Sequence, residues 1–181
     1  MSYLLRTLLV LMIASIILTS LLALKLITFQ FSHIQIAIPA FIYTIFIQAF
    51  VMFYFIGVSK LALNVYSIVT TQNNLGELFD APPADLTPYV TQTKKLWEDA
   101  ERCKRQTIPW TILMLLLGMI AFLLGGAHDT GLVQKSTHSG VVLGFFVSMT
   151  IGFFRQWHYL GKSHILLRKL KSLYQIPDGA M

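Results

Sequence analysis

The sequence predicts an all-α membrane protein with four transmembrane helices, and three observations support this prediction. Apolar residues make up 55% of the chain and charged residues only 12%, against about 25% charged in a typical soluble domain. Four runs contain no Asp, Glu, Lys or Arg: 7–24, 26–59, 106–127 and 136–154. Each run is near or above the roughly 20 residues that a helix needs to cross the hydrocarbon core. We therefore place spans at about 4–27, 35–58, 108–126 and 138–157, within a single membrane domain, residues 1–181.

The first span also has the features of a signal peptide, because Arg6 precedes its apolar stretch. No clear A-x-A-type cleavage site follows the stretch, so we expect a retained helix. Cys103 is the single cysteine, which excludes an intramolecular disulfide and a cysteine-based metal site.

Lys and Arg are distributed asymmetrically about the four spans. Only Lys25 and Lys135 fall on one side, and the other side holds Arg6, Lys60, Lys94, Lys95, Arg102, Lys104, Arg105, Arg155, Lys162, Arg168, Lys169 and Lys171. By the positive-inside rule this bias predicts that both termini and the long middle loop are cytoplasmic. The expected location is the inner, cytoplasmic membrane. The net charge of +6 then indicates contact with anionic lipid headgroups rather than with nucleic acid.

The middle loop, residues 59–107, is expected to form a cytoplasmic helical hairpin. Helical spacing of apolar residues continues beyond the second span, and the stretch 73–76 (Asn-Asn-Leu-Gly) is a plausible stop. A new helix is expected at Thr87, as N-cap, with Pro88 at its first position. Pro39 is similarly expected in the first turn of the second span. The hairpin would extend roughly 20 Å from the membrane at about 1.5 Å per residue.

The fourth span carries a ridge of small residues at four-residue spacing, Gly140, Gly144, Ser148 and Gly152. Such ridges allow membrane helices to approach closely. The sequence leaves open whether this one faces another subunit or the chain's own helices. Residues 160–176 alternate apolar and basic side chains, which predicts an amphipathic helix lying on the inner membrane surface.

Three histidines, His33, His128 and His138, are expected near the outer ends of the second, third and fourth spans. Imidazoles there could hold Zn or Cu, or ligate a haem. The alternative is that they are interfacial side chains, since no short ligand spacing such as H-x3-H is present.

Aromatic residues follow helical spacing in the second span at Phe46, Phe50, Phe53 and Tyr54. With the interfacial Trp157, they are candidates for contact with a lipid, quinone or pigment tail, or else they face lipid or pack in the bundle. Gln48 lies in mid-span and is expected to hydrogen-bond another helix, because an unsatisfied amide in hydrocarbon is costly.

Recognisable catalytic motifs are absent from the sequence, and no carboxylate, Lys or Arg lies in the middle of any span, which argues against enzymatic activity and ion transport. We therefore expect a non-catalytic accessory subunit of a larger inner-membrane complex, with other integral membrane subunits as partners. Composition suggests respiratory or photosynthetic electron transport as its setting. The alternatives are a redox-active subunit that binds haem b or quinone through the outward histidines, and a membrane sensor or auxiliary transport protein.

Overall fold

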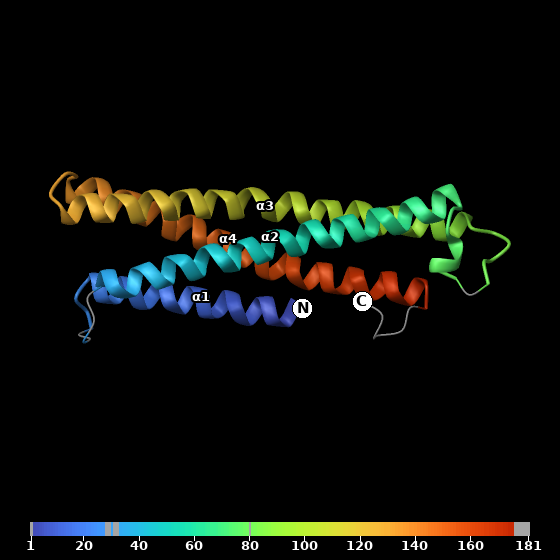
Figure 1. Cartoon of the computed structure of the whole chain (residues 1–181), viewed down its shortest axis with the longest axis horizontal. Helices are drawn as coiled ribbons and strands as arrows, with labels where there is room; N and C mark the ends of the chain where they lie inside the picture. Colours follow the sequence, from blue (N-terminus) through green and yellow to red (C-terminus); the bar gives the residue numbers. More distant parts are fainter. Residues whose placement is uncertain (1, 28–29, 31–32, 80, 176–181) are drawn as a thin grey trace.

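The structure, a computed structural model, describes residues 2–27, 30, 33–79 and 81–175 and is all-helical in these ranges. Four long helices, α1 (Ser2–Ala23), α2 (His33–Thr71), α3 (Thr87–Asp129) and α4 (Lys135–Leu173), share one long axis, with a short 3-10 helix, η1 (Leu75–Glu77), after α2 (Figure 1). All four are long and apolar enough to cross a membrane. The four predicted spans each lie in a different helix.

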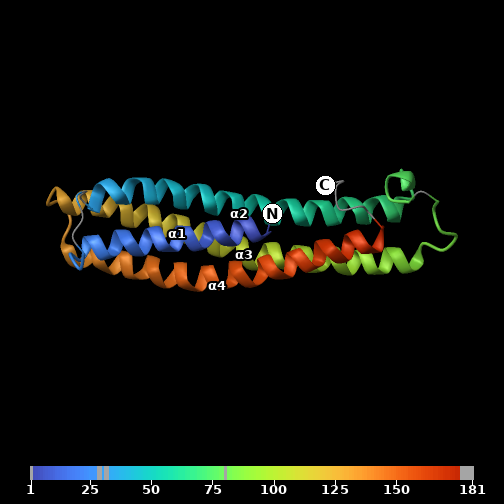
Figure 2. The same cartoon turned by 90° about the horizontal axis from the view of Figure 1, so that it is seen from below.

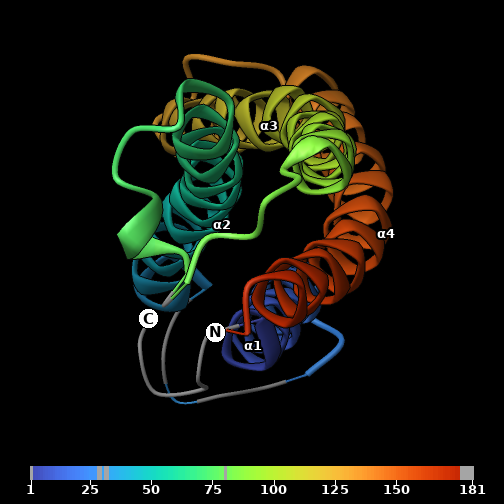
Figure 3. The ribbon, with the colours of Figure 1, turned by 90° about the vertical axis from the view of Figure 1, so that its right-hand side faces the viewer.

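The helices follow one another around the bundle in sequence order (Figure 3). Helix α1 has 22 residues, or about 33 Å at 1.5 Å per residue, which matches a bilayer core of about 30 Å. Helices α2, α3 and α4 have 39, 43 and 39 residues, or about 58 to 64 Å. One half of the bundle therefore contains four helices and the other contains three (Figures 1 and 2). We call the three-helix part the extension, and its far end, where α2 connects to α3, the hairpin end.

The short connections at the opposite end are set by left-handed residues. Lys25 (φ 56°) ends α1, with the Leu26 N–H bonded to the Leu21 carbonyl at 3.0 Å. Gly131 (φ 77°) ends α3 with the equivalent bond, from the Leu132 N–H to the Ala127 carbonyl at 2.9 Å. Both are Schellman motifs, which satisfy carbonyls that a helix end leaves open. The predicted first span, to residue 27, thus ends four residues later than α1.

The connection at the hairpin end lies between Thr71 of α2 and Thr87 of α3. Helix α2 ends at Thr71, before the predicted stop at 73–76, and Gln72 and Asn74 adopt positive φ; α3 begins at Thr87, one residue before the expected first position at Pro88. Thr87 is not the N-cap, however, because this position belongs to Leu86. The Asp85 carboxylate accepts the Thr87 N–H at 2.9 Å and supplies the polar group instead.

The position predicted for Pro39 was wrong, because α2 begins at His33 and the proline lies inside the helix, beyond its first turn. Pro109 lies inside α3 in the same way. Both prolines are exposed, so their rings face away from the packed side of each helix.

The predicted surface helix, residues 160–176, was also wrong within the part that the structure describes. Residues 160–173 continue α4 without a break. Leu166 is buried with Ala62 and Ala100, and Leu170 is buried with Val65 and with residues of the hairpin end. An antiparallel pair of helices leaves an apolar groove along one side, and the apolar stripe of α4 fills it. The stripe therefore belongs to a protein core rather than to a membrane surface.

Candidate functional site

The four small residues of the predicted ridge lie in two different environments. Gly152 is buried, and a Cβ there would collide with the thioether of Met114 on α3. Ser148 is buried as well. Gly140 and Gly144 are exposed, and no atom outside their own helix turn lies within 4 Å of where a Cβ would stand. The bundle thus uses one half of the ridge for its own packing and leaves the other half, which we call the glycine pair, open.

The surface beside the glycine pair is apolar. Leu143 and Val147 are 66% and 53% exposed on the same side of α4. Val147 also lines a shallow, open hollow of about 270 Å³ on the surface of α4, together with Phe146, Thr150 and Ile151. None of these side chains is charged, so the surface is suited to contact with an apolar helix or an acyl chain.

The predicted aromatic stripe of α2 also divides. Phe46, Phe50 and Phe53 are 59%, 53% and 67% exposed and point away from the bundle. Tyr54 is half-buried, and its hydroxyl accepts a hydrogen bond from the Ser163 hydroxyl at 3.1 Å. Three of the four rings therefore face the surroundings of the bundle, and they enclose no site for a cofactor tail with Tyr54.

Two of the three predicted histidines come together. The rings of His128 and His138 stack with centroids 5.9 Å apart and an interplanar angle of 15°. The Nδ1–H of His128 donates to the Val133 carbonyl at 3.1 Å, which holds the ring against the α3–α4 connection. Axial ligands of a haem approach from opposite faces of the porphyrin, whereas these two rings contact each other directly. The side chain of His33 lies outside the described residues, and those described contain no group of three metal-ligating side chains.

Gln48 has the interhelical partner that its mid-span position requires. Its side-chain oxygen accepts a hydrogen bond of 2.6 Å from the Gln156 amide on α4, which also donates to the Thr111 hydroxyl on α3 at 2.9 Å. Its own amide lies 3.3 Å from the sulfur of Met12 on α1. We call these four residues the glutamine node. It joins all four helices through groups that are at most 1% exposed.

Sequence reasoning did not select Gln156, because it lies at the predicted end of the fourth span, where a polar residue is ordinary. The signal that could have found it was the presence of two glutamines in separate spans. A buried amide side chain needs a donor for its oxygen and an acceptor for its NH₂ group, and a second amide side chain supplies both.

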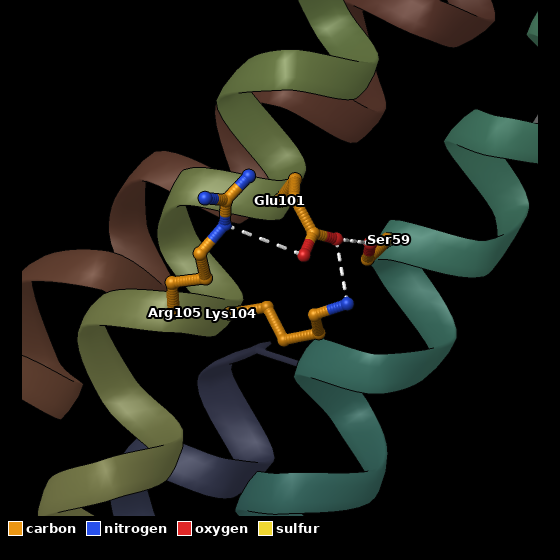
Figure 4. Close-up of polar contacts among 4 residues, drawn as sticks. All are labelled: Ser59, Glu101, Lys104 and Arg105. Atoms are coloured by element: carbon orange, nitrogen blue, oxygen red, sulfur yellow. Dashed lines mark hydrogen bonds and ion pairs between the residues drawn. The ribbon is translucent and has the colours of Figure 1, made fainter.

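A cluster of charges joins α2 and α3 where the extension begins (Figure 4). The Glu101 carboxylate accepts a hydrogen bond from the Ser59 hydroxyl at 2.7 Å and lies 2.6 Å from the Lys104 ammonium. Arg105 approaches it at 3.5 Å. The hydrogen bonds from Lys104, foremost, and from Ser59 lower the pKa of Glu101, so it is ionised at neutral pH. The Ser59–Glu101 hydrogen bond is the part of this cluster that links α2 to α3.

These polar groups hold helices together and show no arrangement typical of catalysis. Burial raises the pKa of the Cys103 thiol, which disfavours the reactive thiolate. The glycine pair is a described surface feature that no contact within the chain explains. Comparisons with protein-family models, curated proteins and solved structures find no match to this chain.

Proposed function

We propose that this chain is a non-catalytic accessory subunit of a larger membrane complex, and that the glycine pair receives a transmembrane helix of another subunit. The observation that carries the proposal is the contrast within the ridge. Gly152 has a tight neighbour in Met114, whereas Gly140 and Gly144 have none.

The energetic cost of glycine supports a helix partner over lipid. Each glycine in a helix interior costs about 1 kcal/mol relative to alanine. Lipid chains gain nothing from a missing side chain, because they adapt to any apolar surface. A second helix does gain, since two backbones can then approach closely, and such packing is a main source of helix association in membranes. Leu143 and Val147 would flank the crossing point.

We further propose, from the distribution of Lys and Arg, that the extension and both termini lie in the cytoplasm of a cell with this chain in its inner membrane. Reporter domains fused after Asp80 and after Met181 should then give a cytoplasmic signal, and a reporter after Thr130 an external one. The measurement is a paired assay with one reporter active only inside and one active only outside. An external signal at Asp80 would contradict the orientation without affecting the fold.

Gly144→Leu should release the chain from its complex while leaving the chain itself folded. Leucine would fill the space that the partner backbone occupies, and overpacking typically costs about 1–3 kcal/mol. The isolated bundle should keep its stability, because no atom of its own lies near that position. The measurement is co-purification of other chains in mild detergent, together with the thermal unfolding of the isolated subunit. The identity of the released chains would also show whether the complex belongs to electron transport.

Gly152→Leu is the matched control, because it belongs to the same ridge but packs against Met114. It should lower the thermal stability of the isolated chain. If Gly144→Leu lowers that stability to the same extent and keeps the partners, the glycine pair is not a subunit interface.

A further inference from the structure

Arg6 of α1 lies flat against α4. Its guanidinium is 4.9 Å from the centroid of the Trp157 ring, and its Nη2 donates to the Trp157 carbonyl at 3.2 Å. Gly161 makes this approach possible, because a Cβ at that position would stand only 2.5 Å from the same Nη2. The guanidinium is thus held in place by an aromatic ring, a backbone carbonyl and a glycine of α4.

Among the described residues, the Arg6 guanidinium donates one hydrogen bond, to the Trp157 carbonyl. An arginine has five N–H donors. The Nε–H of Arg6 is buried and meets no acceptor among the described residues. Neither α1 nor α4 contains an Asp or a Glu, so neither helix supplies a carboxylate for it. Because the Nε–H is covered by the chain, an anion that comes from outside would contact the terminal nitrogens of the guanidinium, which can form charge-assisted hydrogen bonds to a phosphate.

The level of Arg6 along the bundle matches that of lipid headgroups. Trp157 is partly exposed beside it, and on the α3 side of α4 the Arg155 guanidinium lies 5.5 Å from the Trp110 ring and 6.0 Å from the Tyr159 ring. Trp and Tyr collect at membrane–water interfaces, where their rings are half in the apolar phase. Arg6 also lies two residues before the uninterrupted apolar run 8–14 of α1.

The apolar hollow described above lies on the same side of α4 as Trp157, farther from the hairpin end. Thr150, in its lining, precedes Trp157 by seven residues, which is almost two helical turns and about 10 Å along the axis. Phe146, also in the lining, precedes Trp157 by eleven residues, or three turns. The Phe153 ring contacts the Trp157 ring at 5.7 Å and lies between the two levels. The Arg6 guanidinium and the apolar hollow are therefore aligned along the long axis of the bundle, in the way that the headgroup and an acyl chain of a phospholipid are aligned.

We propose that Arg6 and Trp157 bind the phosphate of an anionic phospholipid, and that one of its acyl chains occupies the hollow lined by Phe146 and Thr150. The positive charge of Arg6 selects an anionic headgroup, and the hollow holds the acyl chain of the lipid. This site lies nearer the hairpin end than the glycine pair, and the two surfaces meet at Val147, which lines the hollow.

The test uses the purified full chain in neutral detergent micelles. Phosphatidylglycerol added to the micelles should raise the thermal unfolding temperature saturably, because a ligand that binds only the folded state stabilises it. Phosphatidylcholine at the same concentration should raise it much less, and inorganic phosphate should not raise it. Arg6→Gln should weaken the apparent affinity for phosphatidylglycerol about ten-fold or more, as expected for loss of charge-assisted bonds. Arg155→Gln, a matched loss of charge at the same level on the α3 side, should leave it unchanged.

Thr150→Trp provides a second variant, which leaves Arg6 and Trp157 unchanged. Thr150 is exposed, so a large side chain there should fill the hollow without disturbing the core, and it should weaken the response to phosphatidylglycerol while leaving the lipid-free unfolding temperature unchanged. Equal stabilisation by phosphatidylcholine would overturn the headgroup assignment. Equal stabilisation by inorganic phosphate would show a soluble anion site instead. A full response retained in both Arg6→Gln and Thr150→Trp would place any bound lipid elsewhere.

Discussion

Leu170→Ala should destabilise the extension by about 2–5 kcal/mol, the range for removing a large aliphatic side chain from a packed core. Leu170 is fully buried between α4 and the hairpin, in contact with the cluster that includes Val65, Val69 and Tyr174. Its loss leaves a void that the surrounding helices can fill only in part. Amide hydrogen exchange should therefore become faster in residues 60–71 and 87–107, and the unfolding temperature of the chain should fall.

Ile165→Ala is the control for this prediction, because Ile165 lies on the same segment of α4 but is 55% exposed. It should change exchange in the hairpin little. The two variants distinguish a packed helix from one that lies on a membrane. A membrane-bound helix would leave exchange in the hairpin unaffected by Leu170→Ala, and that result would contradict the structure.

Gln156→Leu should destabilise the four-helix half of the bundle, although leucine is similar in size and better suited to an apolar core. The substitution removes the hydrogen bond that the Gln48 oxygen accepts from Gln156, and it leaves the buried Gln48 amide without its acceptor on α4. A buried polar group without a partner costs about 1–3 kcal/mol. Interhelical hydrogen bonds in membranes average nearer 0.6 kcal/mol, because the separated helices find other partners, so we expect a value at the lower end of that range. The measurement is reversible unfolding in mixed micelles.

The double variant Gln48→Leu/Gln156→Leu provides the decisive comparison. It removes both amides, so neither is left unsatisfied, and it should be more stable than Gln156→Leu alone. Gln92→Leu, at an exposed position of α3, is the control for the substitution itself. A double variant whose loss equals the sum of the two single losses would show that Gln48 and Gln156 do not act as a pair.

Much of the fold could be predicted because its causes are local. A charge-free run as long as residues 106–127 is placed in a membrane by the cost of desolvating charge and by the thickness of the bilayer, and neither depends on the neighbouring helices. The start of α3 at Thr87 was predicted for a similar reason, since Pro88 is suited to the first turn of a helix. The need of Gln48 for an interhelical bond also followed from its depth alone.

The partners of each helix face were decided only by the tertiary structure. The stripe that includes Leu166 and Leu170 has the same spacing whether it meets lipid or protein, and the groove between α2 and α3 made it part of a core. The ridge from Gly140 to Gly152 is regular in sequence, yet Met114 reaches only one end of it. Periodicity shows which side chains share a face, because it depends on the geometry of one helix. It does not show what covers that face, because contact between helices depends on their crossing, their relative position along the axis and the shape of side chains far away in the sequence.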